Sequence, residues 1–444
     1  MKKLLSIFLI LSIVLVCNAQ DFNKYFEDAT LRLDYIFSGN VNNQFISIDE
    51  LSKIPRWYGK RNRLSEVPVE GNGRLIVREL NTNKILYYNS FSTLFQEWLS
   101  YDEAKVKTRA FQNVFLMPFP KEKVNVTVEL NNNRREVIAS YTQTVDPNDI
   151  LIRRIGNKNI TPYETLQQAD DTTRCIHIAY VAEGYTDKEM PIFLKDCHIA
   201  MEALFAHEPF KSLRTKFNII AVKSKSKDSG TSEPGKGQWK STALSSNFNT
   251  FYSDRYLTTL HLKDLHNILA GTPYEHIIVL VNTNNYGGGG ILNSYNLSMA
   301  HHPAFKPVVV HEFGHSFAGL ADEYAYGNEQ IPMYPHDIEP WEKNITTLVN
   351  FKEKWSSMVD KKTPIPTPEP NDLYSKQKNK HKKWNIGAYE PAGYSMHGVY
   401  RAFPDCRMRT NTNPEFCPIC RKAITDVIDS VSYTHLTLPT TPYV

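Results

Sequence analysis

The first third of the chain alternates apolar and polar positions with a period of two, which is typical of half-buried strands. The runs 74–80 and 84–88 flank the turn residues 81–83. The run 124–130 is followed by three asparagines and then by a second strand-like run at 137–141. Each pair reads as a hairpin, because turn residues separate two strand-like segments. We expect a β-sandwich in this part of the chain.

The pattern changes after the polar stretch 161–173. Apolar runs at 175–182, 217–222 and 276–281 predict buried strands, and the capping box that starts at Thr186 predicts a helix between the first two. Strands that alternate with helices indicate a domain of mixed α/β (α+β) class. The predicted organisation is a signal peptide at 1–19, an all-β sandwich accessory domain at 20–165, an α/β domain at 166–430 and a non-native tail at 431–444.

The N-terminus has the features of a secretory signal peptide. Lys2 and Lys3 precede an apolar run from Leu4 to Val16, which is well short of the roughly 20 residues that span a bilayer. Cys17 offers a lipid attachment point, but the bulky Val16 before it disfavours that processing. Since no later segment reaches membrane-spanning length, we expect an exported protein, either secreted, periplasmic or on the cell surface.

Composition narrows the possible functions. The net charge of +4 is too small for a nucleic-acid binder that relies on bulk charge, and 41% hydrophobic with 22% charged residues is typical of a globular protein.

Five cysteines follow the signal peptide, so at least one has no disulfide partner within the chain. Cys417 and Cys420 form half of a zinc motif that Cys406 and His397 would complete; a disulfide or buried thiols are the favoured alternatives.

One motif carries the chemistry. His311, Glu312 and His315 form HExxH, and Pro307 lies where a helix can begin. On a helix the two histidines lie one turn apart and point to one place, as metal ligands must. Zinc lowers the pKa of its water toward about 7, and Glu312 is placed to take the proton of that water and pass it to a leaving amine.

A third ligand is expected shortly after the helix. Gly319 can end the helix and reverse the chain, which would bring Asp322 to the metal and complete an open site of three protein ligands. Glu323 is the nearest alternative. Glu339 or Glu342 would need a following helix, but Pro332, Pro335 and Pro340 interrupt that segment.

The segment HEFGHSFAGLADEY, from His311 to Tyr324, resembles the signature of the IgA peptidase family of metallopeptidases, metallopeptidase family sixty-four, which is metzincin-like. The likeness extends over most of residues 175–430 and includes VAEGYT at 181–186, the glycines of 287–289, and the cysteine motifs at 406–409 and 416–420. The resemblance implies Zn²⁺ held by His311, His315 and Asp322, with Glu312 as general base and Met408 in a Met-turn beneath the metal.

These observations predict an exported zinc-dependent endopeptidase that acts on protein or peptide substrates, with a host glycoprotein as one possibility. Tyr394 and Tyr400 are candidate hydrogen-bond donors to the substrate oxyanion. The glycines of 287–290 are expected at the rim of the substrate cleft. The alternative is a surface-associated protein- or glycan-binding module with a structural or vestigial zinc site, although retention of Glu312, which is not a ligand, favours the enzyme.

Overall fold

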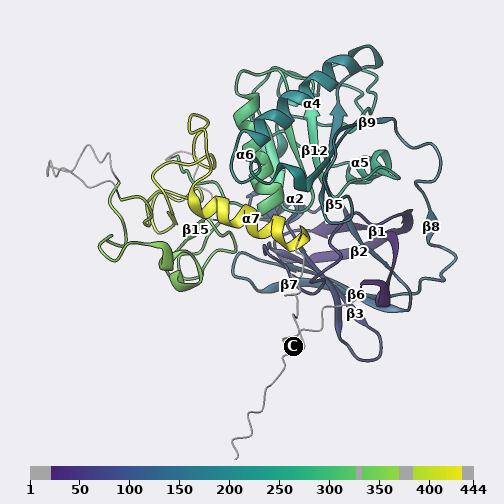
Figure 1. The fold of residues 1–444 in the computed structure, drawn as a ribbon, viewed down its shortest axis with the longest axis horizontal. Coiled ribbons are helices and arrows are strands. Elements are labelled where there is room, and N and C mark those ends of the chain that lie inside the picture. Colours follow the sequence, from purple (N-terminus) through teal and green to yellow (C-terminus); the bar gives the residue numbers. More distant parts are fainter. Residues whose placement is uncertain (1–21, 327–332, 370–383, 433–444) are drawn as a thin grey trace, which may run out of the picture.

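A computed structural model describes residues 22–326, 333–369 and 384–432 (Figure 1). The predicted signal peptide lies outside these ranges, and so does the predicted tail apart from Val431 and Ser432. Those two residues complete the last helix, α7 (Pro418–Ser432), and Val431 is buried. The helix therefore continues into the segment that the sequence analysis assigns to the tail.

The N-terminal region is built from two four-stranded sheets, with strand orders β5-β1-β2-β8 and β4-β3-β6-β7. Both predicted hairpins form: β3 pairs with β4 and β6 pairs with β7, each antiparallel. The prediction of a β-rich N-terminal region is confirmed. Its elements are α1 (Phe22–Tyr25), β1 (Phe26–Gly39), β2 (Gln44–Pro55), β3 (Gly73–Glu79), β4 (Ile85–Phe91), α2 (Leu94–Trp98), α3 (Glu103–Val106), β5 (Arg109–Pro120), β6 (Val124–Asn131), β7 (Val137–Val145) and β8 (Arg153–Arg154).

Aromatic side chains join these two sheets. The rings of Phe91 in β4 and Phe115 in β5 lie 4.2 Å apart, and those of Tyr35 in β1 and Tyr141 in β7 lie 6.3 Å apart. Each pair connects one sheet to the other, so the side chains between the sheets form a shared core. Aromatic residues suit this role because each buries a large apolar area.

The second region contains a six-stranded sheet with the order β13-β14-β12-β10-β11-β9. The four central strands are parallel, and the edge strands β13 and β9 are antiparallel to their neighbours. The predicted mixture of helices and strands is confirmed. Its elements are β9 (Tyr163–Gln167), β10 (Ile176–Glu183), α4 (Met190–Phe205), β11 (Phe217–Val222), α5 (Leu262–Leu269), β12 (His276–Val281), β13 (Gly288–Ile291), β14 (Tyr295–Met299), α6 (Phe305–Ala318), β15 (Ile345–Thr346), β16 (Tyr400–Arg401) and α7.

The two faces of this sheet pack against different layers. In β10, Ile178 and Tyr180 belong to the core formed with α4, α6 and α7, whereas Ala179 and Val181 belong to the core shared with α5 and the N-terminal sheets. Successive side chains of a strand point to opposite faces, which explains this division. The sheet is thus a middle layer, and the N-terminal sheets lie on the side away from α4 and α6 (Figure 1).

β9 lies across the predicted domain boundary at 165/166. It pairs with β11, so the six-stranded sheet takes in residues from Tyr163 onward. A hydrogen bond also ties the two regions together: the buried Arg32 in β1, which pairs with Asp34, donates to Asn267 in α5 at 2.8 Å. The division into two separate domains stays a prediction.

Helix α6 carries the HExxH motif and begins at Phe305 rather than at Pro307. Val310, Phe313 and Phe317 are buried, as their common face predicts, and they anchor the helix in the core. The helix ends at Gly319, whose φ of 56° and ψ of 35° are left-handed. A side chain here would be strained, and a Cβ atom would lie 2.6 Å from Val69 Cγ1, so glycine is required for the chain to turn.

Candidate metal centre and cleft

α6 presents two histidines and one glutamate to an open cleft of about 820 Å³. His311 Nε2 and His315 Nε2 lie 3.0 Å apart, because the residues are one helical turn apart. Glu312 lines the same cleft. The structure therefore brings all three residues of the motif together.

The loop after Gly319 returns Asp322 to these histidines. Asp322 Oδ1 lies 3.0 Å from His311 Nε2 and 3.4 Å from His315 Nε2. Asn344 holds the loop beside it by bonding both the backbone N–H and the carbonyl of Ala321, each at 2.8 Å. The backbone N–H of Gly393 donates to the carbonyl of Asp322 at 2.9 Å. These contacts fix the backbone that carries the Asp322 carboxylate and use neither of its two oxygens.

Both histidines are oriented by backbone carbonyls. His311 Nδ1 donates to the carbonyl of Arg407 at 3.0 Å, and His315 Nδ1 donates to the carbonyl of Leu320 at 2.5 Å. A carbonyl only accepts hydrogen bonds, so each Nδ1 carries the hydrogen and, in the neutral ring, each Nε2 offers a lone pair. This is the arrangement that metal-binding histidines adopt.

The donor set fits a single metal ion. Ligand atoms bound tetrahedrally to zinc at about 2.0–2.1 Å lie about 3.3 Å from one another. The three separations among the nitrogens of His311 and His315 and the Asp322 oxygen are 3.0, 3.0 and 3.4 Å. Two imidazoles and one carboxylate leave room for a fourth ligand, which is a property of catalytic zinc sites.

The electrostatics also favour a positive charge among these residues. Burial alone would raise the pKa of Asp322 and lower that of His315. Their mutual attraction outweighs burial, so it holds the pKa of Asp322 below its usual value and raises the pKa of His315 to about 9. In the metal-free chain a proton on His315 supplies the charge that a cation would otherwise supply.

Glu312 is held against a glycine-rich edge strand. A Cβ atom at Gly288 in β13 would lie 2.7 Å from Glu312 Oε1, and one at Gly290 would lie 2.9 Å from His315 Cβ. Glycine at both positions lets β13 approach α6 this closely. Burial raises the pKa of Glu312, although the neighbouring histidines lower it. A carboxylate with a raised pKa is a stronger proton acceptor.

The other candidate ligands lie elsewhere. Glu323 points to three cysteines rather than to the histidines. Glu339 and Glu342 line the cleft, but Glu339 accepts from the backbone of Asn350 and Glu342 from the hydroxyl of Tyr334. Neither belongs to the group formed by the two histidines and Asp322.

The two candidate tyrosines have different positions. The hydroxyl of Tyr394 donates to Asp322 Oδ2, so this side chain lines the cleft and orients the carboxylate. Tyr400 lies in β16 and is not among the residues that line the cleft. Met408 is buried against α6, where its sulfur would lie 2.7 Å from a Cβ atom at Gly314.

Sequence reasoning missed the contribution of the N-terminal region. Glu97, which follows β4 in α2, lines the cleft together with Thr93 and Tyr101. The hydroxyl of Tyr256 donates to Glu97 at 2.5 Å, and burial raises the pKa of Glu97 to about 7. No local spacing connects Glu97 with the HExxH motif, because the two lie in different helices, α2 and α6, that are far apart in the sequence.

Comparison with known families agrees with this site. The family model described as IgA Peptidase M64 matches residues 165–385 and 377–428, which together make up more than half of the chain. The chain belongs to the IgA peptidase M64 family. A second model, described as Peptidase M64 N-terminus, matches residues 21–142. No curated protein matches the sequence.

Membership of the M64 family confirms the resemblance seen in the sequence and implies a metallopeptidase that acts on protein substrates. The matched residues contain all three members of the histidine and aspartate group. Within the described parts of this M64 chain, the helices are too short or too polar to cross a bilayer.

The histidine–aspartate group makes metal binding dependent on pH. A bound metal needs neutral His315, whose pKa in the metal-free chain is about 9, so binding at lower pH displaces one proton. We expect the apparent zinc affinity to fall about tenfold for each unit of pH between about 8 and about 6. Competition with a chelator of known pH dependence measures this slope. An affinity that is constant over this range would contradict it.

Gly288→Ala tests the contact between β13 and Glu312. The new Cβ atom would displace the Glu312 carboxylate, so we expect kcat for peptide cleavage to fall about tenfold to a hundredfold with zinc content unchanged. Gly235→Ala, in the exposed 3₁₀-helix Pro234–Lys236 outside the cleft, is the matched control, because its Cβ atom would meet only the end of the Asn249 side chain, and it should cleave at the original rate. Equal kcat for Gly288→Ala and the unaltered chain would show that the close approach of β13 has no catalytic role.

Proposed function

We propose that this protein is an exported zinc-dependent endopeptidase. The observation that carries the proposal is the convergence of His311 Nε2, His315 Nε2 and Asp322 Oδ1 beside Glu312 in an open cleft. A site with three protein ligands and an adjacent carboxylate is suited to hydrolysis by activated water. Family membership independently points to a metallopeptidase.

Each residue has a specific role in this proposal. His311, His315 and Asp322 would hold the zinc ion, which supplies an activated water and polarises the scissile carbonyl. Glu312 accepts the proton of the attacking water and donates it to the departing amine, a task that its raised pKa favours. Tyr394 keeps Asp322 in place through its hydroxyl, and it stays a candidate donor to the substrate oxyanion.

The cleft supports a peptide as substrate. Its walls come from both regions of the chain, since they include Glu97 and Arg135 of the N-terminal region and the glycines of β13. The glycines let β13 pack directly against Glu312 and His315, and the cleft that these residues line, about 820 Å³, has room for several residues of a polypeptide. We therefore favour cleavage within a polypeptide over removal of a terminal residue. A host glycoprotein as the natural substrate stays a prediction.

We also propose a metzincin-like catalytic region. The buried Met408 packs against α6 next to His315, and its backbone carbonyl accepts from the N–H of Glu323 at 2.9 Å. Both contacts are consistent with a Met-turn that supports the metal ligands.

Export rests on the N-terminal residues, which lie outside the described ranges, and a secreted, periplasmic or cell-surface location stays a prediction.

Glu312→Gln separates metal binding from catalysis. Glutamine has the same shape but accepts a proton poorly, so kcat should fall by a factor of about 10²–10⁴ with zinc content unchanged. His315→Ala should lose both activity and the zinc at this site, because it removes a ligand. Cleavage of an unbiased peptide library, read by mass spectrometry, measures the rates, and elemental analysis measures the zinc.

Glu202→Gln is the matched control, since Glu202 lies on α4 in an exposed pair with Arg214 and should leave both readouts unchanged. Full activity in Glu312→Gln would refute the mechanism. If the unaltered chain binds zinc but cleaves neither the peptide library nor folded proteins, the result would favour the binding-module alternative.

A further inference from the structure

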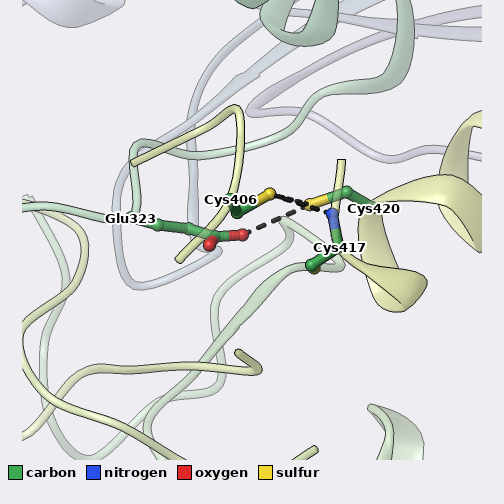
Figure 2. A group of neighbouring side chains, drawn as sticks. All are labelled: Glu323, Cys406, Cys417 and Cys420. Carbon is green, nitrogen blue, oxygen red and sulfur yellow. Dashed lines mark hydrogen bonds between the residues drawn. The ribbon is translucent and has the colours of Figure 1, made fainter. Parts of the chain in front are cut away.

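Four side chains outside the proposed catalytic centre converge in the core. Glu323 comes from the loop after α6, and Cys406 from the turn that contains Met408. Cys417 directly precedes α7, and Cys420 lies in its first turn (Figure 2). All four are buried, and their ligand atoms lie within 4.8 Å of one another. His397, which the sequence offered as a fourth ligand in the less favoured zinc alternative, is exposed and contacts Glu390.

The spacing of the sulfur atoms fits one metal ion. Two thiolates bound tetrahedrally to zinc at about 2.3 Å lie about 3.8 Å apart. The Sγ atoms of Cys406 and Cys420 are 3.7 Å apart, and Glu323 Oε1 lies 3.2 Å from Cys420 Sγ. In addition, the backbone N–H of Cys417 donates to Cys406 Sγ at 3.1 Å, which stabilises negative charge on that sulfur.

Glu323 supplies a second, independent indication. Its side chain is fully buried, and its Oε2 atom has no hydrogen-bond partner among the described residues. The other oxygen, Oε1, accepts from Asn344 at 2.9 Å. Burying an unpartnered carboxylate oxygen is costly unless a cation compensates it. The carboxylate faces the three thiols, where a bound cation would supply that compensation (Figure 2).

We propose that Cys406, Cys417, Cys420 and Glu323 form a second, structural zinc site. Three thiolates select a soft ion such as zinc over calcium or magnesium. Four protein ligands would fill a tetrahedral shell and leave no position for water or substrate, which separates this site from the open catalytic one. Cys417 and Cys420, spaced as a C-x-x-C pair, would hold the same ion from one end of α7.

The site would connect the segments that position the catalytic ligands. Glu323 directly follows Asp322, and Cys406 directly precedes Arg407, whose carbonyl orients His311. One ion bound to Glu323 and Cys406 would therefore fix the Asp322 carboxylate and the His311 imidazole relative to each other. Its bonds to Cys417 and Cys420 would fix them relative to α7. The residues of this site act as positioning residues and do not touch the substrate.

Elemental analysis of the full chain, purified without chelator, tests the proposal. We expect two zinc ions per unaltered chain and one in His315→Ala, which keeps only the structural site. The X-ray absorption spectrum of zinc in His315→Ala should show a sulfur shell at about 2.3 Å. Because this variant leaves the cysteines intact, the result does not depend on the folding of a cysteine mutant, nor on whether the chain is an active peptidase.

Cys417→Ser should lose the zinc with the sulfur shell, whereas Cys197→Ser, a matched change of a buried cysteine in α4, should keep both ions. Folded His315→Ala without zinc, or with zinc bound only by nitrogen and oxygen, would overturn the proposal. Mass-spectrometric detection of a disulfide between any two of Cys406, Cys417 and Cys420 in the purified native chain would overturn it as well.

Discussion

The reversal of the chain at Gly319 is the constraint on which the site depends. The left-handed conformation at Gly319 ends α6 and sends the backbone back across it, which places Asp322 within 3.0 Å of His311 and 3.4 Å of His315. Without that turn, the two histidines would be an incomplete pair on a helix. With it, two imidazoles and a carboxylate surround one point, and Glu312 lies beside them.

The same loop serves two clusters because neighbouring residues point in opposite directions. Asp322 faces the histidines, and Glu323 faces the cysteines. Asn344 contacts both sides of this loop through Ala321 and Glu323, and the backbone of Glu323 bonds that of Met408. The geometry of the catalytic carboxylate is therefore set by contacts on both sides of the backbone, and the proposed second zinc ion would add to them.

Local patterns were sufficient to predict much of the fold and part of the site. The hairpins, the buried strands and the HExxH helix follow from periodicity and turn residues that are close in sequence, and Gly319 marks the return of the chain to Asp322. Glu97 and Asn344 could not be predicted, because they reach the site only through tertiary packing. For the cysteine cluster, the sequence favoured a disulfide or buried thiols and offered His397 only as the fourth ligand of a less favoured zinc site, whereas packing places Glu323 beside the three cysteines.

Anomalous diffraction at the zinc absorption edge, from crystals of the zinc-loaded chain, tests the central claim most directly. The account predicts an anomalous peak between His311 Nε2, His315 Nε2 and Asp322 Oδ1, which line the cleft. A histidine-bound peak whose third protein ligand is Glu339 or Glu342, with Asp322 turned away, would contradict the claim that the turn at Gly319 builds the site. Absence of any peak at the histidines would contradict the metal centre itself.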